Sequence, residues 1–314
     1  MEYNEELHQA ITTLKMGLAQ LETERRNENT MTIDRVSTVE KLQMINNEDM
    51  KVALAVQQVL PTLAAAIDEA TVRLTKGGHV YYVGAGTSGR LGVLDASECP
   101  PTYGVDYDLF TGIMAGGQAA MYKAQEGAED SYEGGKNDLV AVNLNENDIV
   151  VGLAASGRTP YVVGALDYAN EIGAQTVSVC CVTGGEISKH ATYAIEVICG
   201  PESITGSTRM KAGTAQKMVL NMFSSVLMVK AGKVYENLMV DVRPTNEKLV
   251  ARAKRIIAAC THESEEVAGE ALEKSNGDVK VAIIIVLAKC DASRAKEILA
   301  EHHGHVASAI EALK

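Results

Sequence analysis

Residues 79–90 have the sequence His79-Val-Tyr-Tyr-Val-Gly-Ala-Gly-Thr-Ser-Gly-Arg90, an apolar run followed at once by a glycine-rich turn. The apolar run predicts a buried strand, and the residues from Leu91 to Glu98 predict a helix after the turn. Glycines let the backbone turn sharply and come close to a ligand. Because the free N–H groups at the start of a helix attract anions, this turn predicts a phosphate site.

The same turn is a formal match to the dinucleotide-binding pattern, Gly84-x-Gly86-x-x-Gly89. A dinucleotide fold needs an acidic residue at the end of the second strand to hold the ribose. Here the second strand is predicted over 108–115, and it ends in Met114-Ala-Gly-Gly117 without an acid. The sequence also does not match the phosphate-binding loop of proteins that bind nucleoside triphosphates, because Arg90-Leu91 stands where that pattern requires Lys-Ser/Thr. Both nucleotide hypotheses are therefore weaker than a simple phosphate site.

A second turn of the same style supports the phosphate hypothesis. An apolar strand over 148–155 leads into Ser156-Gly-Arg-Thr-Pro160, and an amphipathic helix follows from Tyr161 to about Glu171. The alternative is that each Ser or Thr only caps its helix. Two such turns at the same end of a parallel sheet favour a shared anionic ligand, because ligands of these sheets lie beyond the carboxyl ends of the strands.

Composition limits the class of protein. The 314 residues carry a net charge of −12, which argues against nucleic-acid binding and against anionic membrane surfaces. An anionic substrate then needs local positive charge, for which the candidates are Arg90, Arg158, Arg209 and Lys211. The N-terminus is polar, and the apolar run 279–288 is too short to span a bilayer, so we expect no leader and no membrane span.

The six cysteines show no zinc-ligand spacing, and most lie inside apolar patterns, as reduced thiols of a cytoplasmic protein do. Cys99, beside the glycine turn, is interpreted as a small packed residue, because no histidine lies near it in the sequence. His302, His303 and His305 suggest a metal site, but the alternative of a polar inter-helix turn is favoured.

Alternating patterns predict a parallel α/β sheet with strands near 79–84, 108–115, 148–155, 175–182 and 193–199. Helices are predicted over 1–24, from Ser37 onward with the capping box Ser37-x-x-Glu40, over 49–75 with an interruption at Pro61, and over 207–231. The part from about Asn246 is all helical and repeats a pattern with an offset of 27 residues, from 268–283 to 295–310. This repeat predicts a small bundle of the ubiquitin-associated kind.

Several motifs of the chain resemble the signature of the N-acetylmuramic acid 6-phosphate etherases. The resemblance runs from about residue 21 to the end and is highly specific. The motifs that carry it are Thr23-Glu-Arg-Arg-Asn27, Ile33-Asp-Arg-Val-Ser-Thr38, the run 84–102, Glu126-Gly-Ala-Glu-Asp130, the run 154–160, the run 206–217 and Asn237-Leu-Met-Val-Asp241.

The resemblance implies a sugar isomerase-type (SIS) phosphosugar domain over 57–232, between an N-terminal helical segment, 1–56, and a C-terminal helical domain, 233–314. It implies cleavage of N-acetylmuramic acid 6-phosphate to N-acetylglucosamine 6-phosphate and D-lactate in cell-wall amino-sugar recycling, without metal or redox cofactor. The chain would act in the cytoplasm as a homodimer, with residues 1–24 or the helix after Ser207 at the contact.

The family's two catalytic glutamates correspond to Glu98, the acid for the lactate oxygen, and Glu129, the base at C2. The expected substrate-binding residues are Gly86, Thr87, Ser88, Gly89, Arg90, Ser156, Gly157, Arg158, Thr159, Ser207 and Lys211.

Two other functions share these features. A phosphosugar isomerase would use the same turns and a carboxylate base but would release no lactate. A non-catalytic phosphosugar sensor, as the related glucokinase regulatory proteins are, would bind a partner protein. The presence of both glutamates argues against the sensor.

Overall fold

The computed structural model describes residues 22–242 and 246–313 of the chain. Its contacts divide these residues into two compact units, which are described separately. The first holds the described residues up to Ala96 together with Leu109–Phe223, and the second holds Ser97–Asp108 with the described residues from Ser224 onward. Helices α3 (Gly86–Tyr103) and α7 (Lys211–Lys230) contribute residues to both units.

The first unit is built on a five-stranded parallel sheet, as predicted. Its strands are β1 (Val80–Gly84), β2 (Phe110–Met114), β3 (Ile149–Leu153), β4 (Gln175–Cys180) and β5 (Tyr193–Glu196), in the order β2-β1-β3-β4-β5. Every residue of β1, β3 and β4 is buried. Because helices cover both faces of a parallel sheet, β1 and β3 are apolar runs without alternation, which is why the sequence revealed them, whereas β4 buries Gln175, Thr176 and Ser178 among its apolar residues.

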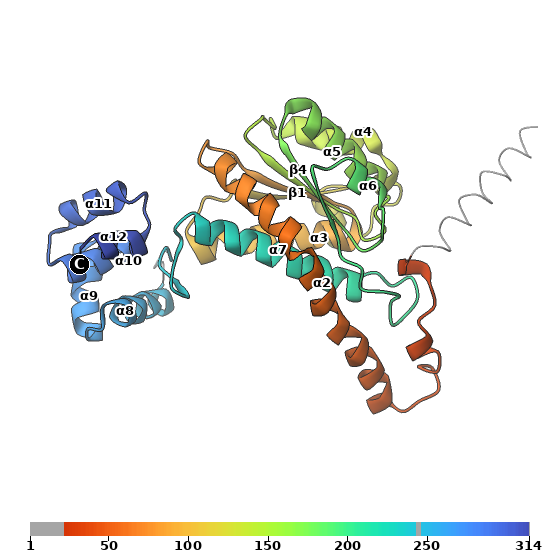
Figure 1. Ribbon diagram of the computed structural model, residues 1–314, viewed down its shortest axis with the longest axis horizontal. Helices are drawn as coiled ribbons and strands as arrows, with labels where there is room; N and C mark the ends of the chain where they lie inside the picture. Colours follow the sequence, from red (N-terminus) through yellow and green to blue (C-terminus); the bar gives the residue numbers. More distant parts are fainter. Residues whose placement is uncertain (1–21, 243–245, 314) are drawn as a thin grey trace, which may run out of the picture. The chain divides into compact units, whose positions relative to one another are not determined.

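Helices cover both faces of this sheet (Figure 1). One face carries α4 (Tyr132–Ala141), α5 (Pro160–Ile172) and α6 (Glu186–Lys189), and α5 packs over Tyr81, Val83 and Val150. The other face carries α2 (Thr38–Leu74) and the parts of α3 and α7 that belong to this unit. There Gly92 of α3 lies so close to Tyr82 that an added Cβ would stand 2.8 Å from the Cβ of Tyr82.

Helix α2 begins with the predicted capping box, in which Ser37 accepts from the N–H of Glu40 while the Glu40 carboxylate accepts from the N–H of Ser37. The predicted interruption at Pro61 is wrong, because α2 continues through it as one helix of 37 residues. Pro61 and Gln57 are both exposed, so the carbonyl that loses its hydrogen-bond partner to the proline ring faces water.

By length and composition α2 is the one helix among the described residues that could cross a membrane. Its C-terminal half is a core helix: Leu63, Ala66, Ile67 and Ala70 are buried, and the Gln175 side chain of β4 donates to the Ala66 carbonyl at 2.8 Å. Of the helix predicted over 1–24, the structure describes only a short 3-10 turn, η1 (Glu22–Glu24), and the rest lies outside the described residues. A second 3-10 turn, η2 (Glu28–Thr30), precedes α2.

The second unit is helical, as predicted. After the hairpin of β6 (Val234–Tyr235) and β7 (Leu238–Met239) come α8 (Glu247–Thr261), α9 (Glu265–Lys274), α10 (Val279–Ala288), α11 (Ala292–Glu301) and α12 (Val306–Ala312). The predicted repeat is confirmed, since Asn276 and His303 occupy matching left-handed positions with φ of 57° and 52°, each before a glycine. His302, His303 and His305 therefore belong to an inter-helix turn.

Candidate active site

The two predicted phosphate turns follow neighbouring strands. Strand β1 pairs with β3, with Gly84 opposite Leu153, so both turns leave the same edge of the sheet. The chain then passes to opposite faces, because α3 covers one face and α5 the other. In open parallel sheets a crevice forms at such a switch point, outside the carboxyl ends of the strands, and ligands bind in it.

Three glycines shape the first turn. Gly84 and Gly89 touch through their backbones, so an added Cβ at Gly89 would lie 2.6 Å from the Gly84 carbonyl oxygen. Gly86 has a φ of +53° and is exposed at the first position of α3. The first turn of α3 contains no acidic side chain. The N–H of Gly89 donates to the Ala85 carbonyl at 3.1 Å, whereas the N–H groups before it lie at the start of the helix, where an anion is favoured.

The hydroxyl side chains of the two turns differ in burial and in hydrogen bonding. Ser88 is buried, and its Oγ donates to Oε1 of Gln216 at 2.8 Å. Ser156 and Thr159 are half-buried, and Thr159, at the N-cap of α5, makes no capping hydrogen bond. The Gly157 backbone, with φ of +68°, lies against Gly185, and Arg158 is exposed. The capping alternative is thus wrong for Thr159.

A cavity of about 230 Å³ connects the first turn with the segment that carries Glu129. Glu129 is exposed on the 3-10 turn η4 (Ala128–Asp130). The cavity also has Arg90 in its wall, whose guanidinium donates to the carbonyls of Ala120 at 2.7 Å and Met121 at 2.9 Å. Its full lining is Ala85, Gly86, Arg90, Met114, Ala115, Ala120, Ala124, Gln125, Glu126, Gly127, Ala128 and Glu129. The structure thus brings Gly86, Arg90 and Glu129 to one cavity.

Glu98, the other predicted catalytic residue, lies on α3 among the residues of the second unit, and its side chain is exposed. The exposed Glu98 side chain is accessible to a ligand.

Lys211, predicted to bind substrate, is buried at the first position of α7. Its Nζ donates to Oε2 of Glu48 and to the carbonyl of Cys199, both at 2.8 Å. Burial raises the pKa of the Glu48 carboxyl, but hydrogen bonds from Lys211, Lys51 and Asn29 outweigh it and hold this pKa at about 2. The ammonium of Lys211 is therefore paired inside the protein.

Glu202 closes the same end of α7, because its carboxylate accepts from the backbone N–H groups of Lys211 and Ala212 at 2.8 and 2.9 Å. Burial raises the pKa of Glu202. Ser207 lies half-buried in the loop before it. This end of α7 contacts the first turn, since an added Cβ at Gly213 would lie 3.6 Å from Cγ2 of Thr87. Sequence reasoning missed Gln216 and Glu48, whose partners Ser88 and Lys211 are distant in the chain. It also missed Glu202, which accepts from backbone N–H groups 9 and 10 positions later.

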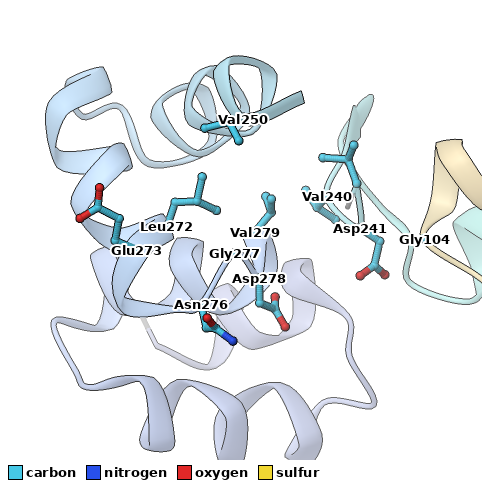
Figure 2. A pocket seen from close by; sticks show the side chains of 11 residues that line it. Gly104, Val240, Asp241, Val250, Leu272, Glu273, Asn276, Gly277, Asp278 and Val279 are labelled. Atoms are coloured by element: carbon cyan, nitrogen blue, oxygen red, sulfur yellow. The ribbon is translucent and has the colours of Figure 1, made fainter. Parts of the chain in front are cut away.

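A cavity of about 800 Å³ in the second unit is lined by residues of α8, α9 and α10 and by residues 240–242, which follow the β6–β7 hairpin (Figure 2). Its polar groups are largely paired within the protein. Asp241 forms ion pairs with Lys233 at 3.1 Å and Lys280 at 2.5 Å, and Asp278 caps α10 by accepting from Val281 N–H. The motif that ends at Asp241 thus ties the hairpin to α10.

Comparison with known proteins gives the same family as the motifs. Residues 62–170 match the family model described as glucokinase regulatory protein N-terminal SIS domain. An N-acetylmuramic acid 6-phosphate etherase of Clostridium botulinum (strain Okra) is 58% identical over 296 residues, which cover 94% of this chain and 98% of that protein. The etherase of Clostridium beijerinckii is 54% identical over 94% of this chain and 97% of its own length.

Among solved structures, a Bacteroides fragilis protein proposed to be a phosphosugar isomerase has a TM-score of 0.50 at 16% identity. The match covers 64% of this chain and 95% of that one, and it concerns the fold alone. The identity to the two etherases extends over almost the whole length of both chains. The chain therefore belongs to the N-acetylmuramic acid 6-phosphate etherase family.

Proposed function

We propose that the protein cleaves the D-lactyl ether of N-acetylmuramic acid 6-phosphate, yielding N-acetylglucosamine 6-phosphate and D-lactate in the recycling of cell-wall amino sugars. One observation carries the proposal: a single cavity joins an anion-binding helix start at Gly86 to the carboxylate of Glu129, in a chain 58% identical to a named etherase. That arrangement suits a substrate with a phosphate at one end and an acidic C–H at the other.

We propose that the phosphate binds at the crevice between the two turns. The N–H groups around Gly86 and Thr87 would donate to it, as would the hydroxyls of Ser88, Ser156 and Thr159. The N–H of Gly89 donates to the Ala85 carbonyl at 3.1 Å, so Gly89 would act through the close turn that it makes with Gly84. Gly157 would give the second turn its close approach, and the side chains of Arg158 and Ser207 would add contacts to the phosphate. The Gln216 amide is oriented by its own bond from Nε2 to the Val179 carbonyl at 3.4 Å, so the Ser88 hydroxyl would turn its proton from Gln216 to the phosphate. Lys211 acts from inside, by holding α7 beside Thr87.

The reaction divides into elimination and hydration. In the open-chain sugar the C1 aldehyde acidifies the C2 proton, which Glu129 removes. The C3–O bond then breaks, and Glu98 gives its proton to the departing lactate oxygen. Glu98, now a carboxylate, takes a proton from water as the water oxygen bonds to C3 of the unsaturated aldehyde. Glu129 finally returns its proton to C2, so both glutamates end as they began.

The proposal is tested by incubating the protein with N-acetylmuramic acid 6-phosphate and assaying D-lactate. We expect one D-lactate for each N-acetylglucosamine 6-phosphate formed. Isomerised sugar phosphate without lactate would identify an isomerase, and binding without turnover would identify a sensor.

A first prediction concerns the phosphate site. Ser156→Ala should weaken binding of N-acetylglucosamine 6-phosphate by about 1.5–3 kcal/mol, the range for a hydrogen bond to a charged group. Ser88→Ala should weaken it within the same range, because the Ser88 hydroxyl would exchange its bond to Gln216 for one to the phosphate. Isothermal titration measures both. Binding equal to the parent in both variants would exclude a shared phosphate site.

A second prediction concerns assembly, and we propose a cytoplasmic homodimer. All six cysteines are free and five are buried, which suits a reducing compartment. On α2, exposed apolar side chains follow one side of the helix, with Val39 74%, Leu42 63%, Met50 62% and Leu54 64% exposed. A stripe of this kind suits an interface with a second copy of the chain.

Because Leu54 is exposed, Leu54→Glu should leave the fold intact and shift the dimer toward monomer. Light scattering at micromolar concentration measures this change. A monomeric parent protein would contradict the proposal.

A further inference from the structure

We propose that Arg90 is a positioning residue, which holds the segment 116–131, and with it Glu129, against the first turn of α3. The inference rests on the proposed role of Glu129 as the C2 base. It reassigns a cation that the sequence placed among the substrate-binding residues.

The hydrogen bonds of Arg90 carry the inference. Arg90 is half-buried, four residues after Gly86, where the contact between Gly84 and Gly89 fixes the start of α3. Its Nε donates to the Met121 carbonyl at 2.9 Å, and one terminal nitrogen donates to the Ala120 carbonyl at 2.7 Å. Both carbonyls belong to the 3-10 turn η3 (Gln118–Met121). A planar guanidinium that makes two such bonds fixes both the distance and the orientation of the turn.

The segment that Arg90 holds has little burial of its own. Between Gly116 and Asp130 only Ala120 is buried. The backbone hydrogen bonds described within it are local, such as Ala120 N–H to Gly117 and Asp130 N–H to Gly127. Gly116, Gly117 and Gly127 all have positive φ, and glycine has more accessible backbone conformations than any other residue. Ala128 of η4 is half-buried against the core cluster that includes residues of α5, and Arg90 adds the attachment of η3 to the helix that starts the cavity.

The alternative role for Arg90 is direct contact with the substrate phosphate. Its acceptors here are neutral carbonyls, so its positive charge remains uncompensated by them and adds to the potential in the cavity. The bonds to Ala120 and Met121, however, already engage two of its three nitrogens. Arg90→Lys separates the two roles, because it keeps the charge and cannot reproduce the paired bonds.

We expect Arg90→Lys to lower kcat by roughly 10- to 100-fold, since a small displacement of a catalytic group has effects of this size. The inhibition constant of N-acetylglucosamine 6-phosphate should change by less than about threefold, because the phosphate turn is intact. Hydrogen–deuterium exchange of peptides covering 116–131 should become at least about tenfold faster, while exchange in α5 stays unchanged. Lys123→Met, which removes an exposed charge from the same segment, is the matched control and should leave all three values unchanged.

Unchanged exchange in 116–131 for Arg90→Lys would overturn the proposal. A parental kcat together with a raised inhibition constant would also overturn it, because that result indicates that Arg90 binds the phosphate. If Arg90→Lys unfolds the protein, exchange in α5 will also become faster. In that case Arg90→Gln, whose amide keeps hydrogen-bond donors, serves as the second variant and is judged by the same criteria. The exchange measurement needs no turnover. If the parent protein releases no lactate, the proposed function fails while the attachment by Arg90 is still tested.

Discussion

Glu129→Gln is expected to lose both D-lactate release and exchange of the C2 proton with deuterated water. If Glu129 is the base at C2, nothing else in the reaction can begin without it, because the enolate must form before the C3–O bond breaks. Removal of a general base costs on the order of 10²–10⁴ in rate. The glutamine keeps the size and the polarity of the side chain, so the exposed turn η4 should keep its conformation.

The measurement has two readouts, proton NMR of the C2 position in deuterated buffer and an enzymatic assay for D-lactate. Asp130→Asn is the matched control, since Asp130 is exposed on the same turn and does not line the cavity. The control should retain the parental rate within a small factor. Parental exchange at C2 in Glu129→Gln would remove Glu129 from the role of base.

Local sequence signals predicted most of the fold. Buried strands of a parallel sheet are apolar throughout, so 80–84 and 149–153 were recognisable from composition alone. The capping box at Ser37 and the repeated helical pair of the C-terminal part also depend on neighbouring residues only. The glycine turn could also be predicted locally, because Gly84 and Gly89, whose backbones touch, are only five positions apart.

The partners of the charged residues could not be predicted in this way. Lys211 binds Glu48, which is 163 positions away, and Ser88 binds Gln216 at a separation of 128. No local pattern distinguishes a lysine that binds substrate from one that is paired in the core, because both stand beside polar loop residues. The break expected at Pro61 failed for a related reason, since tertiary packing of Leu63, Ala66 and Ile67 holds α2 together beyond its local preference.

The same limit applies to Arg90. A glycine turn followed by arginine suggests phosphate contact, and only the folded chain places the Ala120 and Met121 carbonyls beside the guanidinium. In the proposed function, the first turn of α3 would bind the phosphate through its N–H groups, without a charged side chain. Arg90 is then not needed for phosphate binding and can hold the segment 116–131. The motif 84–90 would combine these two roles, phosphate binding and attachment of that segment.

Glu98→Gln is expected to lose D-lactate release while it keeps measurable exchange at C2. The aldehyde acidifies the C2 proton whatever happens at C3, so Glu129 can still remove and return it. Without an acid, lactate must leave as an alkoxide, which costs on the order of 10²–10⁴ in rate. Because the Glu98 side chain is exposed, the substitution should not disturb the packing of α3. The same NMR and lactate assays check the result, and melting temperature checks the fold. Loss of exchange in Glu98→Gln with retained exchange in Glu129→Gln would keep the pair and interchange the two roles, whereas parental lactate release would exclude Glu98 from the chemistry.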